Sequence, residues 1–212
     1  MGLGNLRRIR YYLHTISIFN PCNEQNHKMT KNTDINNQEV ATLAGGCFWC
    51  IEGAFSQVRG IQSATSGYMG GESDSPSYEE ICSGKSGHAE VVQLNFDPVI
   101  ISYQEILEIF FTLHDPTQLN RQGHDIGSQY RSAIFFHDEC QQDIAEQIIK
   151  EMIDANTFDQ DIVTQICAAK TFYSGENYHQ DYFNNNPENQ YCQAVVSPKL
   201  AKFRQTFVNK LK

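Results

Sequence analysis

The hydrophobic positions along the chain follow two different periods, which predict strands and helices in alternation. Short apolar or alternating runs predict strands at residues 40–44, 61–69, 90–96, 130–136 and 162–168. Apolar residues at helical spacing predict helices at residues 48–59, 103–114 and 197–211, and a further helix that Asp138 caps. The elements do not repeat as regular βαβ units, so we predict an α+β fold.

Local signals mark where several of these elements begin and end. Ser102 and Glu105 form the S-x-x-E pattern of a capping box at the start of a helix. Gly45 and Gly46 end the first strand in a turn. The next helix begins directly afterwards, so we expect Cys47 at a strand-to-helix junction.

Length, composition and charge exclude several classes of protein. The 212 residues, 40% of them hydrophobic, suffice for one well-buried core, whereas a second complete domain would be cramped. No stretch approaches the ~20 consecutive apolar residues of a membrane-spanning helix, so we expect a soluble protein without membrane contact. The net charge of −9 argues against nucleic acid as a partner, since no basic run offsets it.

The beginning of the chain differs from the rest. Residues 23–38 are polar and rich in asparagine, without apolar periodicity, which is typical of a disordered linker. We therefore predict a disordered extension at residues 1–36 and a single folded domain at residues 37–212. Because Met29 lies within the linker, residues 1–28 are interpreted as the product of an upstream start codon or as a weak targeting segment.

The sequence GGCFWC, residues 45–50, contains the clearest candidate chemistry. Seven cysteines are an odd number for a closed disulfide framework, and a chain of this length needs none, so we expect reduced thiols and a cytoplasmic protein. The pair Cys47 and Cys50 is compatible with metal ligation, a structural disulfide, dithiol exchange or nucleophilic attack. No second C-x-x-C pair is present, which argues against zinc.

The position of Cys47 before a helix favours a nucleophile. The free N–H groups and the positive end of the helix dipole stabilise a thiolate there by about 0.3–1 kcal/mol. Phe48 and Trp49 follow, and because successive helical positions point about 100° apart, at most one of them faces the core. One or both aromatic rings can therefore line a pocket, although burial in the core is the ordinary role of such residues.

Two further segments supply polar candidates. Glu90 follows a glycine-rich loop at the entry of a strand, where it is either a solvated edge residue or, inside an aromatic pocket, a carboxyl group with a raised pKa that donates a proton. Residues 114–132 form a long polar stretch without helical or strand pattern, typical of a functional loop. Asp125 and Tyr130 in this loop are candidate hydrogen-bonding groups. His88, His114 and His124 are interpreted as structural or loop residues.

Several motifs in the same order resemble the A-type methionine sulfoxide reductases, the peptide-methionine (S)-S-oxide reductases. The resemblance extends over about residues 40–204. It rests on GGCFWC at 45–50, GYMGG at 67–71, SYEEICSG at 77–84, GHAEVVQLNFDP at 87–98, HDPTQLNRQG at 114–123, QYRSAIF at 129–135 and YHQDY at 178–182. It implies a two-layer α/β sandwich around a mixed sheet, in agreement with the predicted α+β class.

The resemblance also implies a role for each matching residue. Cys47 matches the nucleophile that attacks the sulfoxide sulfur and becomes a sulfenic acid, and Phe48 and Trp49 match the aromatic walls that hold the methyl group. Glu90 matches the acid that protonates the sulfoxide oxygen. The phenols that bind this oxygen correspond to Tyr78 and Tyr130, supported by Asp125. The expected substrates are oxidised proteins, peptides and free methionine sulfoxide, with no bound cofactor or metal, and we expect a monomer.

Regeneration of the nucleophile leaves two alternatives. A second thiol condenses with the sulfenic acid to a disulfide, which thioredoxin, or dithiothreitol in its place, then reduces. Family members use either a cysteine in the position of Cys50 or one near the C-terminus, as Cys192 is here. We favour Cys50, because separation by three residues places it on the Cys47 side of the helix. The alternative functions are a thioredoxin-type dithiol-disulfide oxidoreductase and a binding domain without catalysis.

Overall fold

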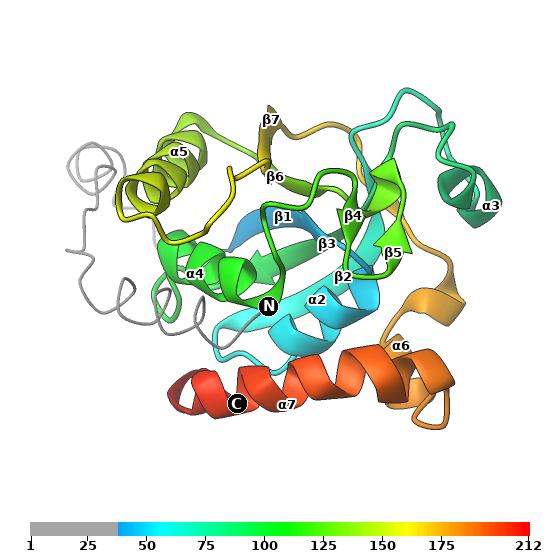
Figure 1. Ribbon diagram of the computed structural model, residues 1–212. Coiled ribbons are helices and arrows are strands. Elements are labelled where there is room, and N and C mark those ends of the chain that lie inside the picture. The colour runs from blue at the N-terminus through cyan, green and yellow to red at the C-terminus, as the bar shows by residue number, and fades with distance from the viewer. Residues whose placement is uncertain (1–37) are drawn as a thin grey trace, which may run out of the picture.

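A six-stranded sheet forms the centre of the computed structural model, which describes residues 38–212 (Figure 1). The predicted extension at residues 1–36 lies outside the described residues. The strand order is β7-β6-β1-β3-β2-β8. The strands are β1 (Glu39–Gly45), β2 (Ile61–Met69), β3 (Ala89–Phe96), β6 (Ser132–Phe136), β7 (Gln165–Ala168) and β8 (Tyr173–Ser174). All neighbours are antiparallel except β6 and β7, so the sheet is mixed.

Four longer helices and several short ones connect the strands. The longer ones are α2 (Phe48–Phe55), α4 (Tyr103–Leu113), α5 (Glu139–Asp154) and α7 (Ser197–Thr206). The shorter helical elements are α3 (Tyr78–Cys82), α6 (Tyr182–Asn185), the 3-10 turns Ser128–Tyr130, Asn177–His179 and Val208–Lys210, and the π-helical turn Cys192–Val196. Within residues 38–212, no helix has the length and apolar character needed to cross a membrane.

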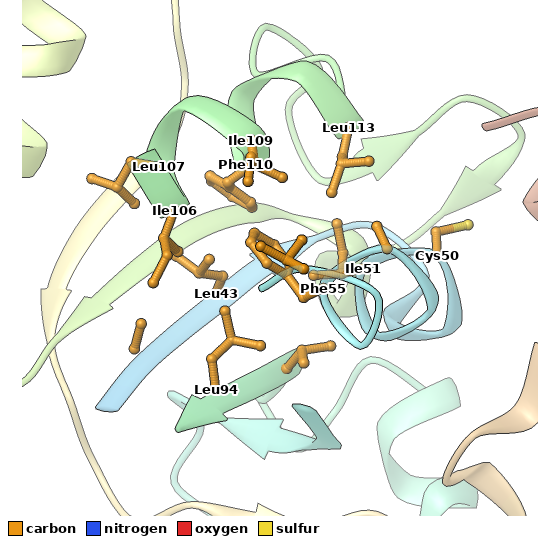
Figure 2. Packing of buried hydrophobic residues seen from close by; sticks show 14 of the residues in the cluster. Leu43, Cys50, Ile51, Phe55, Leu94, Ile106, Leu107, Ile109, Phe110 and Leu113 are labelled. Atoms are coloured by element: carbon orange, nitrogen blue, oxygen red, sulfur yellow. The ribbon is translucent and has the colours of Figure 1, made fainter. Parts of the chain in front are cut away.

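The longer helices pack on one face of the sheet, which makes the fold a two-layer sandwich. In Figure 1, α2 (cyan) and α4 (green) lie over the central strands, and α7 (red) lies beside α2. Leu43 and Leu94 of the sheet contribute to the core that Ile51, Phe55 and Phe110 of the helices complete (Figure 2). The opposite face carries a smaller apolar cluster, against which the half-buried Phe172 packs. The predicted α+β sandwich is therefore confirmed.

The alternation of side chains along β3 decides where Glu90 points. Val92, Leu94 and Phe96 belong to the core beneath the helices, whereas Val91 belongs to the cluster on the opposite face. Because side chains of a strand point to alternate faces, Glu90 shares the helix-covered face with Val92. Its side chain is therefore directed under the layer that contains α2.

Some element boundaries differ from the predictions because tertiary contacts override the local pattern. The helix predicted to reach residue 59 ends at Phe55, although Val58 continues the apolar spacing. Val58 instead forms an isolated bridge with Leu211, which lies beyond the end of α7 at Thr206.

The loop predicted at residues 114–132 has more structure than its polar composition indicates. It contains the small hairpin of β4 (Arg121–Gln122) and β5 (Asp125–Ile126), and the following 3-10 turn delays the start of β6 to Ser132. The strand predicted from residue 162 likewise begins only at Gln165.

Candidate active site

Cys47 occupies the N-cap position of α2, as the strand-to-helix junction predicted. Its side chain is only 6% exposed. The preceding Gly46 has a φ of +91°, a conformation that glycine adopts readily. A Cβ atom at Gly46 would lie 2.6 Å from the Cβ of Gln122. The tight turn therefore needs glycine here for two reasons, and it brings the thiol to the start of the helix.

Glu90 is the buried acid of the site. Its side chain is 2% exposed, and its Oε2 accepts a hydrogen bond of 3.1 Å from the backbone N–H of Phe48, the first residue of α2. Burial raises the pKa of Glu90 to about 8, and the charge of Asp125 adds to the increase, while the hydrogen bond from Phe48 opposes it. The carboxyl group is thus protonated near neutral pH, and the reading of Glu90 as a solvated edge residue is wrong.

A cavity of about 310 Å³ brings the predicted site residues together. Its lining comprises Cys47, Phe48, Trp49, Tyr78, Glu90, Asp125, Tyr130, Asn189 and Tyr191. Burial raises the pKa of both Tyr78 and Tyr130, and the charge of Glu90 contributes in each case. Both phenols therefore remain hydrogen-bond donors. Of the residues predicted from sequence, only Cys50 and Cys192 lie outside the lining.

The protonation of Cys47 differs from the expectation at a helix N-terminus. Burial raises the pKa of the Cys47 thiol well above its ordinary value, and Cys50 and Glu90 act in the same direction. A hydrogen bond with the Tyr191 hydroxyl opposes this increase. Desolvation therefore outweighs the helix dipole, whose effect is only about 0.3–1 kcal/mol at an exposed site. Before substrate binds, the side chain of Cys47 is therefore a thiol rather than a thiolate.

The chain is similar in sequence to proteins of a known family. A family model described as peptide methionine sulfoxide reductase matches residues 39–211. The chain belongs to this family. A protein named peptide methionine sulfoxide reductase MsrA from Natronomonas pharaonis is 51% identical over 172 residues, which cover 81% of this chain and 97% of the relative. The MsrA of Chromobacterium violaceum is 52% identical, with coverages of 80% and 96%. The resemblance predicted from the motifs is confirmed.

Solved structures of the reductase family share the fold. The reduced form of Mxr1 from Saccharomyces cerevisiae superimposes with a TM-score of 0.65 at 35% identity, covering 73% of this chain and 89% of that chain. Methionine sulfoxide reductase A of Corynebacterium diphtheriae gives a TM-score of 0.64 at 30% identity, with coverages of 72% and 76%. These matches support the reductase rather than the thioredoxin-type alternative.

Two further cysteines of this reductase are buried without lining the cavity. Cys50, one turn along α2, is 2% exposed, and its backbone N–H donates a hydrogen bond of 3.1 Å to the carbonyl oxygen of Cys47. In Figure 2, Cys50 lies at the edge of the aliphatic core. Cys192 is fully buried at the start of the π-helical turn, and burial, followed by the charge of Cys50, raises its pKa. The geometry therefore places Cys50 in direct contact with the nucleophile.

Tyr191 and Asn189 are site residues that the sequence did not reveal. The Tyr191 hydroxyl donates a hydrogen bond of 2.7 Å to Oδ2 of Asp125. Asn189 Oδ1 accepts hydrogen bonds from the N–H groups of Tyr191 (2.9 Å) and Cys192 (3.2 Å). A sequence signal was the position of Asn189 two residues ahead of Tyr191, since an asparagine side chain often hydrogen-bonds the backbone two residues further along the chain.

The predicted structural role of two histidines agrees with their surroundings. His114 is 2% exposed and lies between the carbonyl oxygen of Phe110 and the Ser132 hydroxyl. Burial lowers its pKa to about 4, so the ring is neutral. His88 is held by the N–H of Gly71 and the carbonyl of Ser73. Neither belongs to the cavity lining, and residues 38–212 contain no group of three or more candidate metal ligands.

Proposed function

We propose that this protein reduces the S-epimer of free and protein-bound methionine sulfoxide to methionine, with Cys47 as nucleophile and thioredoxin as reductant, and so repairs oxidised proteins. Family membership supports reduction of methionine sulfoxide. The observation that carries the proposal is the placement of the protonated Glu90 in the same cavity as the Cys47 thiol. A thiol alone would suit many reactions, but a thiol beside a buried acid suits a substrate with a basic oxygen.

The cavity offers complementary surfaces to the two substituents of the sulfoxide sulfur. Phe48 and Trp49 form the apolar wall for the S-methyl group, and their ring centroids lie 6.1 Å apart. The oxygen faces the carboxyl group of Glu90 and the hydroxyls of Tyr78 and Tyr130. Such donors stabilise the negative charge that develops on the oxygen, and they act strongly because water is largely excluded.

The reaction balances as a transfer of oxygen from one sulfur to the other. Cys47 Sγ attacks the sulfoxide sulfur while Glu90 donates its proton to the oxygen. The oxygen then bonds to Cys47 Sγ while the bond between the two sulfurs and the original S–O bond break, so methionine leaves and Cys47 is left as a sulfenic acid. The thiol proton restores Glu90. The sulfoxide sulfur is reduced by two electrons, and Cys47 is oxidised by two electrons.

Cys50 then resolves the sulfenic acid. Its thiol attacks Cys47 Sγ, an S–S bond forms and water leaves. The short separation of the two residues supports this assignment, since the N–H of Cys50 donates a hydrogen bond of 3.1 Å to the carbonyl oxygen of Cys47. Thioredoxin, or dithiothreitol in an assay, reduces the disulfide by thiol exchange.

The central experiment measures reduction of free and peptide methionine sulfoxide, with separated epimers and dithiothreitol as reductant. We expect activity on the S-epimer only, and loss of this activity in Cys47→Ser. Cys167→Ser is the matched control, since Cys167 is half-buried outside the cavity. Activity on neither S-epimer substrate, or full activity in Cys47→Ser, would refute the proposal.

A second experiment tests the resolving thiol. Cys50→Ser should release one methionine per protein molecule and then stop in the presence of thioredoxin, whereas Cys192→Ser should continue to turn over. Mass spectrometry of the sulfoxide-oxidised wild type identifies the disulfide. A bond between Cys47 and Cys192 instead of Cys50 would transfer the resolving role to Cys192.

A further inference from the structure

The indole of Trp49, which lines the cavity, is not fixed by a hydrogen bond within residues 38–212. Its indole Nε1 is buried and has no hydrogen-bond partner among the described residues. The orientation of the indole is therefore set by ring contacts rather than by a polar anchor. The closest of these is with Tyr182, the first residue of α6, whose ring stacks on the indole with centroids 3.7 Å apart and planes within 5° of parallel.

Tyr182 is itself held at both ends. At the backbone end, the buried carboxylate of Glu52 accepts a hydrogen bond of 3.1 Å from the N–H of Asp181, the residue before Tyr182. At the other end, Asn189 Nδ2 donates to the Tyr182 hydroxyl at 3.3 Å. Asp181 has a φ of +51°, which is uncommon for a residue other than glycine.

Glu52 and Trp49 belong to the same helix, so these contacts lead from α2 to α6 and back to α2. Glu52 of α2 holds the start of α6, and Tyr182 at the start of α6 supports Trp49 of α2. Glu52 is only 4% exposed, and its removal would leave the N–H of Asp181 without this acceptor. Tyr182 is thus held at its backbone end through Asp181 and at its hydroxyl through Asn189.

We propose that Tyr182 is a positioning residue that sets the width of the methyl-binding site through Trp49, with Glu52 and Asn189 fixing its place. Tyr182 does not line the cavity, so it does not contact the substrate. The inference rests on the proposed function, in which Trp49 holds the S-methyl group. A rigid indole excludes a larger S-alkyl group, whereas an indole free to tilt admits it, so Tyr182 controls selectivity for methyl over ethyl sulfoxides.

The test compares methionine sulfoxide with ethionine sulfoxide in Tyr182→Leu. One methylene in an apolar pocket changes kcat/KM by about 10- to 200-fold. We therefore expect Tyr182→Leu to lower the methyl-to-ethyl ratio of kcat/KM by roughly tenfold, chiefly through a higher kcat/KM for the ethyl substrate. Tyr182→Phe retains the stacked ring and should restore the wild-type ratio. Tyr182 is half-buried, and Tyr182→Met carries the same test if the leucine variant does not fold.

Fluorescence supplies an independent readout, because Trp49 is the single tryptophan of the chain. Tyr182→Leu should shift the emission to longer wavelength and increase quenching by acrylamide, and Tyr182→Phe should not. Phe207→Leu is the matched control, since Phe207 is a half-buried aromatic residue whose ring packs at a tilt against Phe203 outside the cavity, with centroids 5.5 Å apart. An unchanged ratio and emission in folded Tyr182→Leu, or equal changes in Phe207→Leu, would overturn the inference.

Trp49→Leu separates failure of this inference from failure of the proposed function. If Trp49→Leu leaves kcat/KM for methionine sulfoxide unchanged, Trp49 is not the wall and the proposed substrate site is wrong. If Trp49→Leu lowers kcat/KM while Tyr182→Leu retains the wild-type ratio, the site stands and only the role of Tyr182 is wrong.

Discussion

Single residues in this protein acquire their chemistry from burial more than from sequence position. Glu90 and Cys47 both have raised pKa values, and in both cases desolvation is the largest cause. A protonated acid and a neutral thiol form a pair that carries little charge before the substrate binds. The sequence left Glu90 either as an acid with a raised pKa or as a solvated residue, and the second alternative could be rejected only once the covering layer was known.

The role of Glu90 predicts a pH dependence for the first turnover. The acid form exists below a pKa of about 8, so the rate of methionine release in a single turnover should fall as the pH rises through that value. Glu90→Gln removes the proton donor and should lower the rate by about 10²- to 10⁴-fold, without this dependence. Rapid-quench measurement from pH 6 to pH 9 checks the prediction, with Glu146→Gln at an exposed position of α5 as control. An unchanged rate in Glu90→Gln would exclude the acid role.

The start of a helix decides where the first side chain of that helix lies. Within residues 38–212, capping boxes of the same kind occur at Ser77 with Glu80 and at Ser102 with Glu105. The first begins α3, whose first residue is the phenol Tyr78, and the second begins α4, which contributes to the core. The box at Ser102 was recognised from sequence, whereas the short α3 was not, because its five residues show no periodic pattern.

The two boxes allow a matched comparison of stability with catalysis. Ser77→Ala and Ser102→Ala should each lower the free energy of unfolding by about 1 kcal/mol through loss of the N-cap. Only Ser77→Ala should also lower kcat/KM, on the order of tenfold, since a shift of ~1 Å in a positioned group can reduce the rate up to ~100-fold. Urea unfolding and steady-state kinetics measure the two effects. Equal kinetic effects in both variants would show that α3 does not position Tyr78 for catalysis.

The stability of the whole molecule depends on the protonation of two buried carboxyl groups, those of Glu90 and Glu52. Glu90 and Glu52 have folded-state pKa values of about 8 and about 7, both raised above the ordinary value of 4.5 mainly by burial. From about pH 4.5 up to these raised pKa values, the folded state therefore binds more protons than the unfolded state. The resulting contribution to stability is fully present below about pH 4.5 and is lost as the pH rises through about 7 and 8.

This pH dependence can be measured by comparing the free energies of unfolding of Glu90→Gln and wild type at several pH values. Glu90→Gln has no proton to lose, so its free energy of unfolding relative to wild type should increase between pH 5 and pH 8. A difference of one in pKa corresponds to about 1.4 kcal/mol, so the increase should amount to a few kcal/mol. Urea unfolding at pH 5, 6.5 and 8 tests this, with the exposed Glu146→Gln as control. A constant difference across this range would contradict the raised pKa of Glu90.

The sequence by itself determined the features that depend on neighbours along the chain. Strands and helices were predictable from apolar periods, and the position of Cys47 before α2 followed from the Gly45–Gly46 turn. The motifs were specific enough to identify the reductase family. The expected α+β class followed from the order of elements, because this order reflects which faces must be buried.

Only the tertiary structure decided the features that depend on contacts between distant segments. It brought Tyr182, Asn189 and Tyr191 to a site that begins at Cys47, although more than a hundred residues of chain separate them. It also reversed the expected ionisation of Cys47, because the desolvation of a thiol depends on what covers it. Local propensity contains no information on the distant segments that bury the thiol. The protonation of Cys47 therefore follows only from the tertiary structure.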